Sequence, residues 1–251
     1  MTSIAPFPSA TRLAPRLVRA RAVTHFFGVG DVTTAAVKNV SCEVRAGELV
    51  LLTGPSGSGK TTLISLLAGM LRASAGDVHL LGVGLRDLRE RDVLRLRRYG
   101  LGFVFQRYNL FPGLTALENV VEPLVIKGYS RASATERGRE VLSLLGLEQR
   151  MANLPGQLSG GQQQRVAIAR ALSSRPALVI GDEVSAALDW ETTQQVLGVL
   201  RQYVGTDSAV LLVTHDERLE RYADRVLEMR EGELVTDRRS NEPPNAAVGC
   251  T

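Results

Sequence analysis

The chain alternates between short apolar runs and longer segments with helical spacing. The apolar runs predict strands at 17–27, 39–44, 49–52, 77–81, 101–105, 177–183, 208–213, 225–230 and 233–236. The periodic segments predict helices at 63–71, 86–98, 115–126, 132–145, 158–174 and 190–203. Strands separated by helices of this length are typical of an α/β fold.

Local signals fix several element ends and divide the chain. Thr115 and Glu118 have the capping-box spacing, Gly146 is a C-cap, and Arg175-Pro176 ends a helix. Because two or three helices separate the strand at 101–105 from the next strand, we expect a helical subdomain at about 107–165. The Pro- and Ala-rich residues 1–16 and the polar sequence from about Asp237 onward predict disordered tails around one domain at 17–238.

A glycine-rich loop lies between the apolar run 49–52 and the helix at 63–71. Its glycines allow successive backbone N–H groups to face inward and hold phosphates, and Lys60 adds a positive charge. The Thr61 hydroxyl at the helix start is a candidate Mg²⁺ ligand. The alternative is a glycine-rich turn without a ligand. The predicted phosphate-binding residues are Gly54, Pro55, Ser56, Gly57, Ser58, Gly59, Lys60, Thr61 and Thr62.

A second glycine-rich helix start follows at Leu158 to Gln162. Ser159 and the N–H groups of Gly160 and Gly161 can hold a phosphate at a helix N-terminus, together with Gln162. A plain N-cap on a structural helix is the alternative interpretation.

Candidate catalytic groups follow two apolar strands. Asp182 and Glu183 end the strand at 177–183, where Asp182 can hold Mg²⁺ and Glu183 can polarise an attacking water. His215 follows the strand at 208–213, where it can contact a γ-phosphate or the catalytic water; a capping or packing role is the alternative.

Composition narrows the class of protein. Its 251 residues, 44% of them hydrophobic, can bury one sizeable core, and no apolar run is long enough to span a membrane. Cys42 and Cys250 form no metal-binding or disulfide pattern. The net charge of +4 leaves nucleic acid or an anionic membrane open as partners, but the mixed signs across Arg86 to Arg98 favour a solvated helix face.

Aromatic side chains mark two further candidate contacts. Phe26 or Phe27, at the end of the first strand, can stack on an adenine ring, with core packing as the alternative. Trp190 is interpreted as a packing residue. The loop Tyr108 to Leu114 follows the strand at 101–105 and is rich in aromatics.

Together these motifs resemble those of the ABC ATPases: Walker A, Q-loop at Gln106, signature, Walker B, D-loop at Asp189 and switch histidine, in order across residues 17–236. The resemblance implies a P-loop NTPase with a RecA-like parallel-sheet core, an antiparallel β-subdomain and an inserted α-helical subdomain. It implies ATP and Mg²⁺ as cofactors and hydrolysis of ATP. Phe27 would stack on adenine, Thr61 and Gln106 would contact Mg²⁺, and Asp189 would lie at the ATP site. Glu183 would be the general base and His215 the γ-phosphate sensor.

The resemblance also implies partners. Walker A and the signature of one chain are expected to face apart, so two copies would meet head to tail around two ATP. The loop Tyr108 to Leu114 would receive a separate integral membrane permease, which places the chain in the cytoplasm on the inner face of the membrane. Within the family, the sequence is similar to the lipoprotein-release and macrolide-exporter ATPases. A regulatory ATPase of the cell-division type is the alternative, and the lack of a coiled-coil insertion or zinc cysteines disfavours a nucleic-acid partner.

Two positions depart from the family pattern. Val184 stands where the family usually has proline, and Ala186 replaces the usual first serine of the D-loop. Both positions are expected at the contact between subunits, where they would alter dimer closure. Because Glu183 is present, we still expect hydrolysis.

Overall fold

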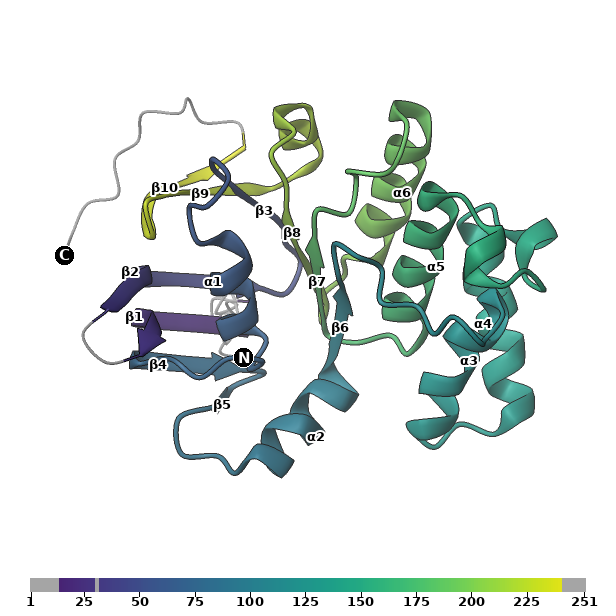
Figure 1. Ribbon diagram of the computed structural model, residues 1–251, viewed down its shortest axis with the longest axis horizontal. Coiled ribbons are helices and arrows are strands. Elements are labelled where there is room, and N and C mark those ends of the chain that lie inside the picture. Colours follow the sequence, from purple (N-terminus) through teal and green to yellow (C-terminus); the bar gives the residue numbers. More distant parts are fainter. Residues whose placement is uncertain (1–13, 30–31, 241–251) are drawn as a thin grey trace, which may run out of the picture.

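The computed structural model describes residues 14–29 and 32–240, which form two sheets with helices between and beside them (Figure 1). The smaller sheet is antiparallel and has the strand order β2-β1-β4-β5. Its strands are β1 (Arg16–Val29), β2 (Val32–Arg45), β4 (Ala75–Leu80) and β5 (Val83–Gly84).

The larger sheet is mostly parallel and has the order β10-β9-β3-β8-β7-β6, with only β10 antiparallel to its neighbour. Its strands are β3 (Leu49–Thr53), β6 (Leu101–Val104), β7 (Leu178–Asp182), β8 (Ala209–Val213), β9 (Arg225–Arg230) and β10 (Glu233–Arg239). The helices are α1 (Lys60–Leu67), α2 (Glu90–Gly100), α3 (Ala116–Ile126), α4 (Arg131–Leu144), α5 (Gly160–Ser173) and α6 (Trp190–Tyr203). Short 3₁₀ helices are η1 (Glu148–Arg150), η2 (Pro155–Gln157) and η3 (Glu217–Tyr222).

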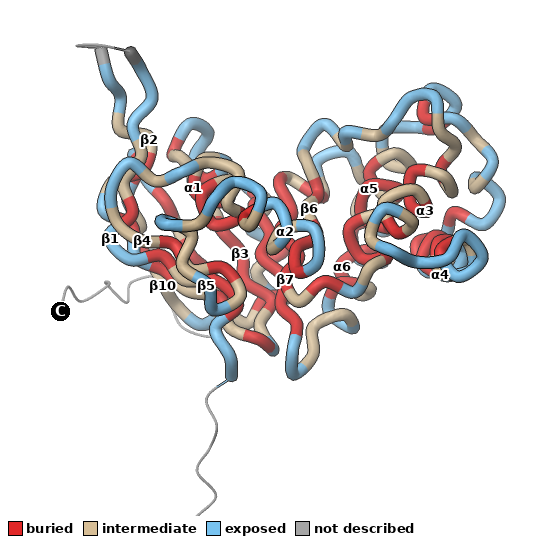
Figure 2. Tube along the Cα trace, turned by 90° about the horizontal axis from the view of Figure 1, so that it is seen from below, coloured by how far each residue is buried: buried red, intermediate tan, exposed pale blue. Residues whose placement is uncertain are grey.

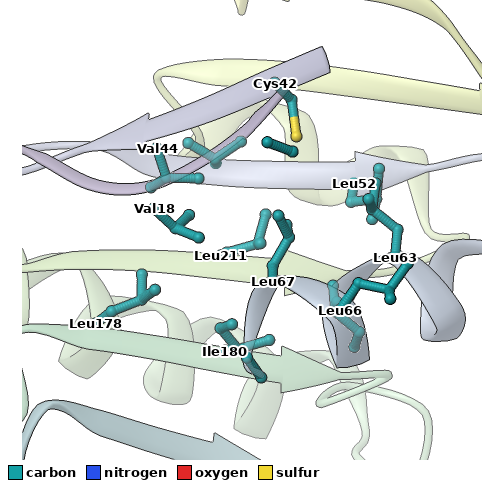
Figure 3. Packing of buried hydrophobic residues seen from close by; sticks show 14 of the residues in the cluster. Val18, Cys42, Val44, Leu52, Leu63, Leu66, Leu67, Leu178, Ile180 and Leu211 are labelled. Atoms are coloured by element: carbon teal, nitrogen blue, oxygen red, sulfur yellow. The ribbon is translucent and has the colours of Figure 1, made fainter. Parts of the chain in front are cut away.

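The central strands are buried on both faces (Figure 2), which explains their continuous apolar sequences. Val50, Ile180 and Leu211 face a core shared with α1 and the antiparallel sheet. Figure 3 shows Ile180 and Leu211 in this core. Leu51 and Val179, from the same strands, face a second core shared with α5 and α6. Alternate side chains of these strands therefore pack into the two cores on opposite faces of the larger sheet.

The register of the parallel strands sets where the functional segments lie. Val213 in β8 pairs with Leu52 in β3 on one side and with Asp182 in β7 on the other. The loop after β3, the residue after Asp182 and the residues after Val213 therefore leave the sheet at one edge. This juxtaposition is the feature of the fold that positions the candidate site.

The helices after β6 form the expected helical lobe, seen on the right of Figure 1. The capping box of Thr115 and Glu118 is confirmed, and Gly146 has the left-handed φ of +66° expected after a helix end. The expected boundary near residue 165 falls inside α5, which continues without a break to Ser173.

Some expected element ends are wrong. α1 ends at Leu67 rather than 71, because Gly69 has a φ of +65°. The strand expected at 39–44 begins at Val32, and the helix expected from Arg86 begins at Glu90. The chain does not lose structure at Asp237: β10 continues to Arg239, and Asp237 accepts a hydrogen bond from Arg225 at 2.5 Å.

The remainder of both predicted tails lies outside the described residues. Within the described part of the chain, no helix combines the length and the apolar character needed to cross a membrane.

Candidate functional site

The glycine-rich loop between β3 and α1 is held by two close approaches of the backbone. Gly54 has a φ of +136°, and a Cβ there would lie 2.1 Å from the carbonyl oxygen of Met229 in β9. Gly59 has a φ of +99°, and its Cβ would lie 2.2 Å from the carbonyl oxygen of Ala36 in β2. Only glycine fits either position, so both sheets shape the loop.

Lys60, the first residue of α1, is 7% exposed. Its ammonium group donates to the carbonyl oxygens of Gly54 and Pro55, both at 2.8 Å. The side chain thus turns back over the loop and adds a positive charge to a site already lined by backbone N–H groups at a helix N-terminus. The arrangement favours an anion.

Asp182 ends β7 beside this loop and is 5% exposed. Burial raises the pKa of its carboxyl group, while the hydrogen bond from Thr61 and the charge of Lys60 oppose that shift. The Thr61 hydroxyl donates to Oδ2 at 3.1 Å. Oδ1 is buried and has no hydrogen-bond partner among the described residues. A buried carboxylate oxygen left unpaired beside a threonine hydroxyl suits a hydrated divalent cation.

Glu183 and His215 meet across the ends of β7 and β8. The His215 Nδ1 lies 3.1 Å from Oε1 and 2.9 Å from Oε2 of Glu183. The Glu183 side chain is 15% exposed, whereas that of His215 is 71% exposed. Glu183 also has a φ of +53°, which is rare for a residue with a Cβ, and its N–H donates to the Val213 carbonyl at 3.1 Å. The backbone therefore aims this carboxylate at some cost, as is common at functional sites.

Part of the glycine-rich loop, Glu183 and His215 line one open pocket of about 670 Å³, a size suited to a small-molecule ligand. Nine of the nineteen predicted site residues are brought together there, and Ala36 joins them from β2. The lining residues are Ala36, Ser56, Gly57, Gly59, Lys60, Thr61, Thr62, Gln106, Glu183, Ala186, Val213 and His215.

The signature residues do not line this pocket. Ser159 is exposed and is the N-cap of α5: its hydroxyl accepts from the Gln162 N–H at 3.2 Å, and Gln162 Oε1 accepts from the Ser159 N–H at 2.9 Å. Gly161 lies close to the loop after β7, since a Cβ there would be 3.0 Å from the Ala187 carbonyl oxygen. Ser159 is thus both a helix N-cap and an exposed residue, and it lies outside the pocket lining.

Six other predicted residues also lie outside the pocket lining: Gly54, Pro55 and Ser58 of the same loop, Asp182 at the end of β7, and Phe27 and Asp189. Phe27 is 47% exposed at the end of β1 and packs edge-on against His25, while Phe26 is 48% exposed. Neither ring is in the core, so the core-packing alternative does not hold for either. Asp189 is the N-cap of α6, and the hydrogen bonds from Thr192 lower the pKa of its carboxyl group.

The aromatic loop Tyr108 to Leu114 is held by two residues that the sequence did not single out. Arg170 in α5 donates to the carbonyl oxygens of Tyr108 and Asn109 at 2.7 and 2.6 Å. Asn119 in α3 is fully buried, donates to the Leu114 carbonyl at 2.9 Å and accepts from the Phe111 N–H at 2.8 Å. Phe111 remains 55% exposed. For Asn119 the sequence did offer a signal, because it is a polar residue on the apolar face of the helix predicted at 115–126.

The expectation for Val184 is wrong. Its side chain is 2% exposed and belongs to the core beside β7, so it cannot present itself to a partner. Val184 lies over Gly181, where a Cβ would be only 2.4 Å from the valine Cγ1. The missing side chain at Gly181 makes room for the branched residue that replaces proline. Ala186, in contrast, is exposed and lines the pocket.

Comparison with known proteins agrees with this geometry. The sequence model of the family described as ABC transporter matches residues 37–186. A probable export ATP-binding/permease protein MacB of Pseudomonas entomophila is 42% identical over 231 residues, which are 92% of this chain and 35% of that protein. The macrolide export ATP-binding/permease protein MacB of Pasteurella multocida is 40% identical over 221 residues, covering 88% and 34%. The chain spans about a third of the length of these curated relatives.

Among solved structures, the chain is similar to the ATP-binding cassette MJ0796, described as a dimer in a post-hydrolysis state bound to ADP and Pi. The TM-score is 0.84 and the identity 36%, with 90% of this chain and 99% of that chain covered. A second dimeric structure of MJ0796, a bacterial ABC transporter cassette, has the same TM-score at 37% identity. The predicted P-loop NTPase fold is thereby confirmed.

The contact between Gly181 and Val184 yields a prediction about stability. Gly181→Ala should lower the free energy of unfolding by roughly 1–3 kcal/mol, because the new Cβ collides with Val184 and approaches Leu212 at 3.0 Å. In the Val184→Ala background the same substitution should cost at least about 1 kcal/mol less. Urea denaturation of the four proteins measures this coupling; strictly additive effects would show that the two residues do not restrain each other.

Asn119 yields a second prediction. Asn119→Ala should lower the free energy of unfolding by about 2–4 kcal/mol, because several backbone groups of the aromatic loop lose a buried partner. Glu122→Ala on the same helix is the matched control, and loss of its partly exposed ion pair with Arg131 should cost less than about 1 kcal/mol. Hydrogen exchange at the Phe111 amide should accelerate only in Asn119→Ala. Equal effects of the two substitutions would contradict this role of Asn119.

Proposed function

Since the chain belongs to the ABC transporter family, we propose that it is an ATP-binding and ATP-hydrolysing subunit that drives a separate membrane permease. The observation that carries the proposal is the convergence of the phosphate-binding loop, Glu183 and His215 on one pocket. The described residues also include a signature helix start outside that pocket. Binding and hydrolysis of ATP follow from the residues that line the pocket, and assembly follows from the position of the signature outside it.

ATP would enter with its triphosphate on the loop between β3 and α1. The backbone N–H groups would donate hydrogen bonds to the phosphate oxygens, and Lys60 would add a positive charge. In the structure the Lys60 ammonium group donates to two loop carbonyl oxygens, and a bound triphosphate would accept from the same group. Phe27, exposed at the end of β1, would stack on the adenine ring.

The donor set beside the phosphates fits Mg²⁺. Thr61, Gln106 and Asp182 would hold the ion, Asp182 through the ion's water shell, and the buried unpaired Oδ1 of Asp182 supports this assignment. Bound Mg²⁺ would neutralise phosphate charge.

Hydrolysis would depend on the contact between Glu183 and His215. Glu183 would accept a proton from the attacking water. His215 would contact the γ-phosphate while its Nδ1 contacts the Glu183 carboxylate. The positive φ of Glu183 and the hydrogen bond from its N–H to Val213 would fix the backbone that carries the carboxylate, and the contact with His215 would orient the carboxylate itself. Such preorganisation favours the transition state over the bound ground state.

A second copy of the chain would complete the site. Ser159 to Gln162 lie on an exposed helix start outside the pocket, so an identical chain turned head to tail would bring its signature against the bound phosphates. Asp189 would lie near the same seam. ATP would then hold the dimer closed, and hydrolysis would let it open.

The aromatic loop Tyr108 to Leu114 is the proposed contact with the permease. Arg170 and Asn119 fix its backbone while Phe111 stays exposed, which provides a rigid apolar contact. The printed names of the relatives favour an exporter of the macrolide-export or lipoprotein-release type. We therefore place the chain in the cytoplasm, peripheral to the inner face of the cell membrane.

Glu183→Gln tests the function directly. The variant should lose roughly 10²- to 10⁴-fold in kcat, because glutamine cannot act as a base, yet it should still bind ATP. With Mg²⁺ and ATP it should accumulate as a stable dimer. Light scattering coupled to size exclusion should give twice the 27.1 kDa mass of one chain.

The matched control adds Lys60→Ala to Glu183→Gln. This double variant should remain monomeric with ATP, because the loop has lost its phosphate-binding charge. A Glu183→Gln protein that binds ATP but remains monomeric would refute the shared site, and wild-type protein that fails to hydrolyse ATP would refute the enzymatic function.

A further inference from the structure

Trp190, the only tryptophan in the chain, has the guanidinium groups of two arginines over its indole ring. It is the first residue of α6, directly after Asp189. The guanidinium carbon of Arg218 lies 4.4 Å from the centroid of the indole ring, and that of Arg221 lies 5.1 Å from it. Both arginines come from η3, the short helix that begins two residues after His215. We call these three side chains the Trp190 clamp.

Arg218 is held in place by Asp216, the neighbour of His215. The guanidinium Nε donates to Oδ1 of Asp216 at 2.9 Å and Nη2 donates to Oδ2 at 2.7 Å. This forked pairing raises the pKa of Arg218 and lowers that of Asp216. An arginine fork on a carboxylate fixes orientation as well as distance. The planar guanidinium therefore presents one set geometry to the indole ring.

The same Asp216 is tied to the sheet. Its N–H donates to the hydroxyl of Thr214 at 3.0 Å, and its carboxylate accepts from the Arg218 N–H at 3.0 Å. Thr214 is fully buried, and its own N–H donates to the Leu52 carbonyl of β3 at 3.2 Å. In the chain, His215 therefore lies between Thr214, which is anchored in the core, and Asp216, which binds Arg218 of the clamp.

A second set of contacts holds η3 on α6. The Gln194 Nε2 donates to the hydroxyl of Tyr222 at 3.1 Å, and Leu219 is fully buried in the core that includes Val196 and Leu197. The clamp adds a further contact between η3 and α6, at the first residue of α6. It joins the start of α6, which Asp189 caps, to the segment that carries the switch histidine.

From these contacts we infer that Trp190 is a positioning residue for hydrolysis: through Arg218 and Asp216 it holds His215 against Glu183, and it couples that contact to the Asp189 loop. This inference rests on the proposed ATPase function. It assigns to Trp190 more than the packing role expected from the sequence. Because the clamp does not touch the phosphate-binding loop, its loss should affect turnover rather than binding of ATP.

Steady-state ATPase kinetics test the assignment. Trp190→Leu should lower kcat roughly tenfold and leave KM for ATP within about twofold, because a displaced base and histidine impair the transition state but not ground-state binding. Trp190→Phe, which keeps an aromatic face for the guanidinium groups, should recover most of the activity. Arg201→Gln, which breaks an exposed ion pair with Asp224 at the other end of α6, is the control and should change kcat by less than twofold.

If Trp190→Leu fails to fold, Arg218→Gln tests the same contact. It removes the guanidinium group from the indole ring by changing an exposed side chain of η3. It should reduce kcat to a similar extent, and the double variant should be no slower than the slower single variant. As Trp190 is the sole tryptophan, its emission also reports the stack: acrylamide quenching should increase in Arg218→Gln and stay unchanged in Arg201→Gln.

Each outcome separates the two proposals. Active wild-type protein together with a Trp190→Leu or Arg218→Gln variant that keeps its kcat within twofold would overturn the clamp assignment alone. Equal loss of activity in Trp190→Leu and Trp190→Phe would also overturn it, since packing volume rather than stacking would then matter. Wild-type protein without ATPase activity would overturn the proposed function, and the clamp assignment with it.

Discussion

The register of the three buried strands β3, β8 and β7 is the constraint on which the site depends. Leu52, Val213 and Asp182 pair in one row at the end of the sheet, and each strand is buried on both faces. A slip of one residue would exchange the two sets of core side chains and is therefore strongly disfavoured. Because the strands end together, the phosphate-binding loop, Glu183 and His215 leave the sheet side by side. The chemistry is thus set by core packing.

Around this edge, contacts between distant segments hold conformations that the local sequence would not adopt. Gly54 and Gly59 press against β9 and β2, Glu183 takes a positive φ, and Gly181 accommodates Val184. Of these, the positive φ of Glu183 is strained, because this residue has a Cβ, and such strain persists where the surroundings determine the geometry. The same principle extends to the loops: Asn119 holds the aromatic loop from α3, and Trp190 joins α6 to the segment after His215. The proposed nucleotide contacts, the proposed permease contact and the proposed catalytic pair therefore all depend on contacts between distant segments.

The sequence predicted those features that are written in adjacent residues. The glycine spacing of the phosphate-binding loop, the apolar strands, the capping box at Thr115 and the N-cap interpretation of Ser159 are local patterns, and the structure contains each of them. The capping box that Ser159 forms with Gln162 was not predicted. Contacts between distant residues have no such pattern. The packing role predicted for Trp190 is confirmed by its contact with the core, but its arginine partners follow a later strand and were not predicted. Val184 is buried rather than at a surface because its contact with Gly181 depends on the turn after β7. Helix and strand ends shifted for the same reason.

The central claim is that phosphate-binding loop and signature meet only between two chains. Site-specific thiol cross-linking tests it, with chains carrying Ser56→Cys mixed with chains carrying Ser159→Cys, both in a Glu183→Gln, Cys250→Ser background. Ser56 and Ser159 are exposed, while the native Cys42 is buried, which raises the pKa of its thiol to about 12 and suppresses its reactivity. A short bifunctional reagent should join the two kinds of chain, and only when Mg²⁺ and ATP are present. Joining that is independent of ATP, or an internal link within one chain carrying both substitutions, would contradict the account.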